Sequence, residues 1–475
     1  MTDRQRRAGR EEGIALLTLL AVVSLGAALA LLAMASPQPL DLKREEITGK
    51  ALAKAKDALI AYAATYADSH IGQVPGYLPC PDLGTAGIGG EGTAEATCAG
   101  ANVSVIGRLP WKTLGIEPPR DGSGECLWYA VSGTFKNSPK TELMNWDTIG
   151  QIEVYGPDGV TLLAGSQPEN RAAAVIFAPG VALGQDRQDD NPGTPQKPIC
   201  SEDYTPARFL EAVDALNNAV ANGTAGALSR FIAGDKSNGF NDRLLLLMPS
   251  EIFGAIEKRS DFAPKLASLA QTAAQCLTQY VRENANYAAG DHRMPWTAPV
   301  VLTAYTADGY FDDAANSLSG RYPFQLDTTK ATPVPNPLAS TLAGASCAFR
   351  TSGADENWWD NWKDHLFYAV AGDFKPSASN PSPVTCGSGC LQVNGNPGQV
   401  AIVMFSGKRL AGQTRSSDVA KGTLANYLEG RNLTNHPNAG GNSNYEKGAP
   451  STTFNDVLYC AGLDGAGNPT AVACP

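Results

Sequence analysis

The apolar residues of this chain follow two patterns: one continuous run near the N-terminus, and two later segments in which they recur every three or four positions. The run extends from Ile14 to Ala35 and contains no charged residue, Pro, Asn or Gln. A helix of this length spans roughly 33 Å at about 1.5 Å per residue, enough to cross the hydrocarbon core of a bilayer. The run therefore predicts a transmembrane helix over residues 14–36.

Two amphipathic helices are expected after this run. In the first, apolar residues recur at helical spacing from Leu42 to Tyr66, with Lys and Asp between them. Pro37 and Pro39 precede it and predict a break from the membrane helix, because proline lacks an N–H and disfavours helical geometry in the residue before it. The second helix is expected around residues 266–280, where no apolar run precedes it.

Four sequence blocks occur twice, in the same order. They pair residues 107–111 with 320–324, 127–136 with 366–375, 174–185 with 401–413, and 240–244 with 454–458. Collinear repeats of this kind indicate a tandem duplication. The second and third blocks are aromatic and aliphatic runs, typical of strands. We therefore expect an α+β protein with two tandem heads, each a helix packed on a small, mostly antiparallel sheet.

The predicted organisation is a leader over residues 1–13, the transmembrane helix over 14–36, a first head over 37–257 and a second head over 258–475. Within the last block of each head, Asp242 and Asp456 both follow Phe and Asn. A repeated Asp at this place indicates a shared structural role, such as capping the turn before the last strand.

The net charge and the lack of catalytic motifs argue against several classes of function. The chain of 475 residues carries a net charge of −10, and no run of Lys or Arg follows the N-terminal arginines. This argues against a general nucleic-acid binder, which needs a concentrated basic face. The sequence has no H-E-x-x-H, G-x-S-x-G or P-loop motif and only four His. We expect no enzyme activity and no cofactor.

All ten Cys follow the apolar run, with an even number in each predicted head, which favours disulfides formed in the periplasm or beyond. A zinc site is disfavoured because the only close pair, Cys386 and Cys390, has no matching second pair. Connectivity cannot be deduced from the sequence. The preferred local pairs are Cys80–Cys98, Cys386–Cys390 and Cys460–Cys474.

The residues around the start of the apolar run carry a family resemblance. Gly13 is followed directly by Ile14 and the run, after a short leader that contains four Arg. This arrangement resembles the type IV pilin and type II secretion pseudopilin superfamily, whose precursors are cut by a membrane peptidase after such a Gly. Most members have Phe first and Glu fifth in the mature chain, where this chain has Ile14 and Thr18. In this it is similar to the minor pilins and large pseudopilins.

The resemblance implies a structural subunit without enzyme activity, placed at the tip of a type IV pilus or type II secretion filament. It implies a prepilin peptidase and other pilin or pseudopilin subunits as partners. The chain would cross the inner membrane once, with its C-terminal part in the periplasm and at the cell surface after assembly. Cleavage between Gly13 and Ile14 is expected. Cleavage after Ala35, at an A-x-A site, and an uncut anchor are the alternatives.

Two further candidate sites carry alternative interpretations. Trp358, Trp359 and Trp362 lie close together and could form a binding face, which would make the chain a membrane-anchored or secreted binding protein or adhesin. Inward packing of the three rings is the alternative. Asp186, Asp189 and Asp190 offer oxygen ligands for calcium, but they lack the spacing of a known calcium loop, which favours a solvated turn. We predict no other metal site.

Overall fold

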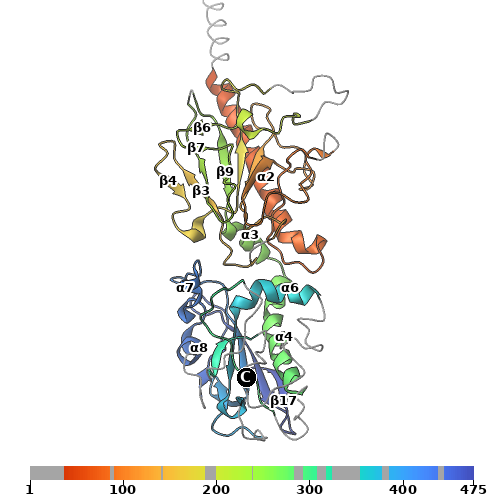
Figure 1. Ribbon diagram of the computed structural model, residues 1–475, viewed down its shortest axis with the longest axis vertical. Coiled ribbons are helices and arrows are strands. Elements are labelled where there is room, and N and C mark those ends of the chain that lie inside the picture. Colours follow the sequence, from red (N-terminus) through yellow and green to blue (C-terminus); the bar gives the residue numbers. More distant parts are fainter. Residues whose placement is uncertain are drawn as a thin grey trace, which may run out of the picture.

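The computed structural model describes residues 37–85, 90–140, 143–187, 199–237, 239–282, 292–306, 317–323, 353–376, 385–436 and 443–475. Figure 1 shows two parts stacked along the long axis, an N-terminal part from α2 to α3 and a C-terminal part from α4 to β17. The predicted leader and transmembrane helix lie outside the described residues. Among the helices that are described, none combines the length and the hydropathy of a membrane span.

Helix α2 (Pro37–Ser69) opens the N-terminal part. It contains both Pro37 and Pro39 in its first turn, so the prediction that this helix starts only at Leu42 is wrong. Proline is accepted there because the first N–H groups of a helix have no intrahelical partner. The buried residues Ala55, Leu59 and Ala63 form the face that rests on β5 and β9.

The main sheet of the N-terminal part is antiparallel, in the order β1-β2-β5-β9. Its strands are β1 (Val105–Arg108), β2 (Trp128–Val131), β5 (Ala174–Ala178) and β9 (Arg243–Leu247). Helix α2 covers one face, and α3 (Pro249–Ile256) packs on α2. A separate apolar cluster that includes Trp128, Phe177 and Phe231 fills the other face. A small sheet of β4 (Leu162–Ala164), β3 (Ile152–Tyr155) and β8 (Ser229–Ile232) contributes to that cluster.

The main sheet of the C-terminal part is also antiparallel, in the order β10-β11-β14-β16-β17. Its strands are β10 (Ser319–Arg321), β11 (Leu366–Val370), β14 (Ala401–Phe405), β16 (Val457–Leu463) and β17 (Pro469–Ala473). Helix α4 (Phe262–Arg282) covers β14, β16 and β17. A small sheet joins β13 (Asn396–Gln399), β12 (Leu391–Val393) and β15 (Asn444–Tyr445).

The two parts repeat one strand register as well as one strand order. Gly107 lies opposite Tyr129 in the first main sheet, and Gly320 lies opposite Tyr368 in the second. The next pairs are Phe177 with Leu244 and Met404 with Leu458, the same positions of the repeated blocks. Both small sheets combine one antiparallel and one parallel pairing. The four sequence blocks thus lie at equivalent places in two similar sheets; the head boundary at 257/258 stays a prediction.

The remaining elements are short. They are β6 (Ala212–Val213), β7 (Leu216–Asn217), α6 (Gly353–Trp362), α7 (Asp418–Lys421), α8 (Gly430–Asn435) and the 3-10 turns η2 (Pro168–Asn170), η3 (Pro206–Arg208), η5 (Lys363–His365), η6 (Gly372–Phe374) and η7 (Leu424–Asn426). Helix α6 lies where the two parts meet (Figure 1). One apolar cluster extends from α2 and α3 through Phe262 to α4 and the second main sheet, so a continuous core joins the two parts.

Disulfides staple loops in both parts. The structure joins the three pairs preferred from the sequence, Cys80–Cys98, Cys386–Cys390 and Cys460–Cys474, and also Cys126–Cys200. Cys276 is disulfide-bonded as well. Disulfides persist in oxidising compartments, so this bonding favours an extracytoplasmic location.

Candidate functional site

The tryptophans predicted as a binding face belong to α6 and face the junction between the two parts. Trp359 and Trp362 are completely buried, and Trp358 is half-buried against the core. The ring of Trp146, from the N-terminal part, meets Trp362 edge-on with centroids 4.8 Å apart. Of the two interpretations offered by the sequence, inward packing is confirmed for Trp359 and Trp362, and an exposed face that includes them is ruled out.

The proposed calcium loop gains no support. Asp186 is exposed, whereas Asp189 and Asp190 lie outside the described residues. Gly13 and Ile14, the predicted cleavage position, also lie outside them. Among the predicted site residues that the structure describes, it brings together the disulfide cysteines and the tryptophans of α6.

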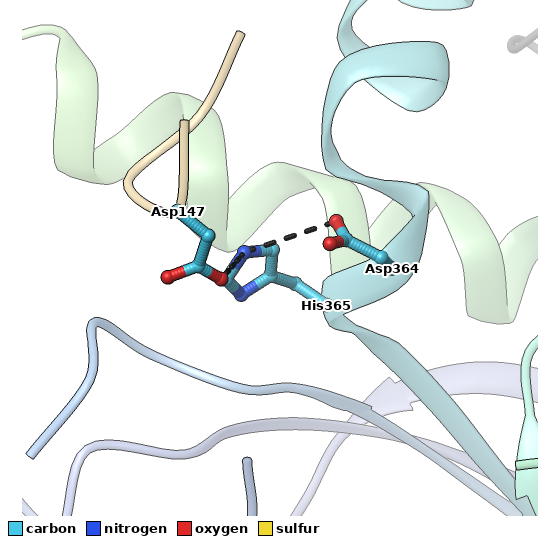
Figure 2. Close-up of side chains that lie close together, drawn as sticks. All are labelled: Asp147, Asp364 and His365. Carbon is cyan, nitrogen blue, oxygen red and sulfur yellow. Dashed lines mark ion pairs between the residues drawn. The ribbon is translucent and has the colours of Figure 1, made fainter. Parts of the chain in front are cut away.

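The cluster with the richest chemistry lies at the junction and was not predicted. Asp147 comes from the loop before β3, while Asp364 and His365 end the turn η5 before β11 (Figure 2). His365 Nε2 lies 3.2 Å from Asp147 Oδ2 and 3.8 Å from Asp364 Oδ1. All three side chains are buried, with exposed fractions of 0 to 3%. One carboxylate from the first part thus meets a histidine and a carboxylate from the second.

Two arginines of the C-terminal part complete the cluster. Arg415 Nη1 lies 3.3 Å from Asp147 Oδ2, and Arg409 Nε lies 3.1 Å from Asp147 Oδ1. Arg415 is fully buried, and its guanidinium lies over the Tyr427 ring at 4.2 Å. Asn145 of the N-terminal part also contacts the C-terminal part. Its side-chain amide donates to Asp364 Oδ1 at 3.1 Å and to the Asn361 carbonyl oxygen at 2.8 Å.

The arginines decide the charge state of Asp147. Burial alone would raise its pKa, because the charged form loses hydration. The positive charge of Arg415, the hydrogen bond and charge of His365, and the charge of Arg409 outweigh burial, so the pKa of Asp147 lies well below its ordinary value. Asp147 is therefore a carboxylate at any pH near neutral, and it anchors cations of the other part.

A metal ion does not fit this cluster well. One ligand atom each from Asp147, Asp364 and His365 lies within 4.8 Å of the others, a spacing compatible with a cation. However, Arg415 Nη1 lies 3.3 Å from Asp147 Oδ2 and also 3.3 Å from His365 Nδ1. A divalent ion would have to sit beside this buried guanidinium, which already neutralises Asp147. The arrangement favours an ion-pair network over a metal centre.

The same cluster contains the residue types of a Ser-His-Asp triad. Ser406 Oγ lies 3.1 Å from His365 Nδ1, on the ring edge away from the Nε2 atom that faces Asp147. A nucleophile must reach its substrate, yet Ser406 and His365 are completely buried. His365 Nδ1 also lies 3.1 Å from the Ser406 carbonyl oxygen, a contact that belongs to strand packing. This geometry supports a structural role.

A pocket of about 280 Å³ opens beside Asp147 at the junction. Its lining includes Asn102, Gln151 and Arg171 from the N-terminal part and Arg415, Ser417 and Lys421 from the C-terminal part. Neither Ser406 nor His365 lines it. Its volume is slightly below the range of ligand pockets, ~300 to 1,000 Å³. Arg415 is paired with Asp147, and Arg171 Nε lies 3.7 Å from Glu153 Oε1, so we assign no ligand.

A longer comparison of the two heads would have found part of this cluster. Arg187 and Arg415 follow the third repeated block by two residues, in the segments GQDR and GQTR. Both guanidiniums donate to a backbone carbonyl after the preceding strand, that of Gly180 or Gly407. Asp147 has no comparable signal, because its role depends on contact with the other part.

Comparison with known protein families, curated proteins and solved structures finds no match for this chain.

Proposed function

We propose that this chain is a minor pilin or pseudopilin-like structural subunit at the tip of a type IV pilus or type II secretion filament. The observation that carries the proposal is the placement of α2. This long helix follows directly after the predicted membrane segment and packs its apolar face on an antiparallel sheet. A membrane helix continued by a helix docked on a strand-rich head is the plan implied by the family resemblance.

The stacking of the two parts supports a tip position. In Figure 1 the start of α2 lies at one end of the described molecule and the C-terminal part at the other. A further subunit added at that end of the first head would collide with the second head, which already occupies the space. The junction cluster and the continuous core make this second head a fixed extension. Such a subunit can end a filament more readily than repeat along it.

The disulfides agree with a periplasmic or surface location of everything after α2 begins. The alternative, a binding protein using the tryptophans of α6, loses the observation on which it rested, because Trp359 and Trp362 are buried. We therefore propose the filament subunit alone. Its partners would be other subunits, a prepilin peptidase and the inner membrane.

The decisive experiment is mass spectrometry of the mature N-terminus from membranes of cells that contain or lack a prepilin peptidase. We expect a chain that starts at Ile14 only when the peptidase is present. Gly13→Ala should block this cut, while the matched control Gly9→Ala should leave it intact. A mature start at Ser36, or an uncut Met1 in both strains, would refute the pilin route.

Filament position is tested separately. Antibody labelling of sheared filaments should place the C-terminal part at filament ends. Labelling along the whole length would contradict the tip assignment and leave the cleavage result standing.

A further inference from the structure

A buried pair of carboxyl groups joins two segments of the N-terminal part. Glu211, just before β6, lies within hydrogen-bond reach of Asp242, which precedes β9. Asp242 Oδ2 accepts from the Glu211 backbone N–H at 2.9 Å and from the Asn218 amide at 3.0 Å. Glu211 Oε2 accepts from the backbone N–H groups of Asn241 at 3.2 Å and Asp242 at 3.0 Å, and Oε1 accepts from the Gln185 amide at 3.2 Å. Both side chains are buried.

The C-terminal part repeats this pair. Asp456 Oδ2 accepts from the Glu429 backbone N–H at 3.1 Å and from the Asn432 amide at 2.9 Å. Glu429 Oε2 accepts from the Asn455 backbone N–H at 3.1 Å, and Oε1 accepts from the Gln413 amide at 2.8 Å. Both of these acids are also buried. The same four side-chain types therefore meet in both parts, and the Asn241 and Asn455 N–H groups donate to equivalent glutamate oxygens. The first pair adds the Asp242 N–H as a second donor to Glu211.

One oxygen of each pair has no donor. Asp242 Oδ1 and Asp456 Oδ1 are buried and receive no hydrogen bond, whereas the other three oxygens of each pair receive N–H groups. Two ionised carboxylates in one buried site repel each other, whereas a proton between them turns the contact into a hydrogen bond. We infer that the folded chain binds two protons at neutral pH, one in each part, each on the Oδ1 atom of the aspartic acid and donated to its glutamate.

The charged groups around the first pair agree with this placement of the proton. Arg187 Nη2 lies 3.9 Å from Glu211 Oε1 and its Nη1 lies 3.3 Å from Glu125, so the glutamate is the member with a cation beside it. The Asp121 carboxylate is engaged separately, because its Oδ2 accepts from the Gly180 N–H at 2.7 Å. Arg243, next to Asp242, is paired with Glu45 at 3.1 Å.

The arginines near the second pair are ion-paired with other acids. Arg415 donates to Gln413 Oε1 at 3.4 Å and is ion-paired with Asp147. Arg431 Nε lies 3.6 Å from Glu446 Oε2. None of these contacts brings a cation to the Oδ1 atom of Asp456. The amide and N–H donors already on the other oxygens also disfavour a metal ion, because a cation would have to displace them.

The proton makes stability depend on pH with a definite sign. Burial, followed by the neighbouring glutamate, raises the pKa of Asp242 and of Asp456 well above their ordinary value. In the unfolded chain an aspartic acid loses its proton near pH 4. The folded chain thus holds more protons, and the stabilisation present below that pH is lost as the pH rises through the folded pKa.

The test uses the full-length chain in detergent, with Asp242→Asn, Asp456→Asn and the double variant. An Asn carbonyl can accept the N–H groups that Oδ2 accepts, while its amide donates to the glutamate, so it mimics the protonated acid without titrating. We expect an infrared carbonyl band of protonated carboxylic acid at pH 7 in the wild type. The band should be about halved in each single variant and absent from the double variant.

A second readout is the unfolding equilibrium constant in urea between pH 5 and 7. Relative to the double variant, the wild-type constant should rise about a hundredfold per pH unit, tenfold for each bound proton. The control Asp57→Asn, an exposed carboxylate on α2, should change neither band nor slope. Absence of the band from the wild type at pH 7 overturns the inference even where a variant fails to fold. So does a band that persists in the double variant.

Discussion

Removing the charge of Asp147 tests the junction most directly. Asp147→Asn keeps the size of the side chain but leaves the fully buried Arg415 without its carboxylate and takes the anion from beside His365. Breaking a buried ion pair on one side costs about 3–5 kcal/mol, because the remaining charge stays uncompensated. Arg409 keeps a second partner in Glu169 at 3.4 Å, so its contribution to the loss is small. We therefore expect the free energy of unfolding to fall by about 3–5 kcal/mol.

The matched control is an exposed ion pair that also joins the two parts. Lys408 Nζ lies 3.0 Å from Glu257, but the two side chains are 55% and 30% exposed. Lys408→Met should cost less than about 1 kcal/mol. The double variant Asp147→Asn/Arg415→Met removes both buried charges and should cost clearly less than the sum of its two single variants.

Urea unfolding of the full-length chain measures these differences, and hydrogen exchange localises them. The Met144 N–H donates to Asn361 Oδ1 at 2.7 Å across the junction, so it should exchange faster in Asp147→Asn while the N–H groups of β2 and β5 do not. Because the pKa of Asp147 is lowered, the wild type keeps this stabilisation above about pH 4 and loses it in acid. A loss no larger than that of Lys408→Met, or additive single variants, would refute the reasoning.

Three further predictions concern stability, each measured by urea or thermal unfolding. Gly320→Ala should destabilise the chain, because a Cβ there would overlap the Ala298 carbonyl oxygen. Gly49→Ala, on the open surface of α2, should stabilise it by about 0.5–1 kcal/mol. Similar effects of the two substitutions would contradict the close approach at Gly320. Replacing Cys126 and Cys200 by Ser should lower the free energy of unfolding more than replacing Cys386 and Cys390. The first disulfide spans a sequence separation of 74 residues and the second only 4. Equal losses would argue against the chain-entropy account. The wild type should lose stability in mild acid because the buried His436 resists protonation, and His436→Gln should remove this loss. Burial, and then Arg321, lower the pKa of His436 to about 4, although its hydrogen bond to Gly320 opposes them. The folded His436 stays neutral down to about pH 4, whereas an unfolded histidine binds a proton below about pH 6.5. The free energy of unfolding should therefore fall by up to about 3 kcal/mol as the pH drops from about 6.5 toward 4. An unchanged acid limb in the variant would count against this origin.

The two long helices and the central strands of the main sheets could be predicted because their signals are local. Helical spacing of apolar residues located α4 and most of α2, and the second and third repeated blocks coincide with β2, β5, β11 and β14. The small sheets were not predicted. Strands as short as Asn444–Tyr445 have no periodic pattern, and each small sheet includes a parallel pairing between strands far apart in the chain.

The junction could not be predicted, because its partners are distant in sequence and belong to different heads. Arg415 and Asp147 are 268 residues apart. The carboxyl pairs were within reach, since Asp242 and Asp456 already indicated a shared role before the last strand. The segments FLE, ending at Glu211, and YLE, ending at Glu429, form a further repeated block that would have supplied their partners.

One equivalent position makes a different long-range contact in each part. Cys126 and His365 both directly precede the Leu that leads into the second repeated strand, β2 or β11. In the N-terminal part this position is tied by a disulfide to Cys200 within the same head. In the C-terminal part it holds a histidine that meets Asp147 of the other head. Each buried carboxyl pair links segments of its own head, whereas His365 contacts Asp147 of the other head. Replacing His365 by cysteine should therefore remove the contact with Asp147 while leaving both carboxyl pairs in place.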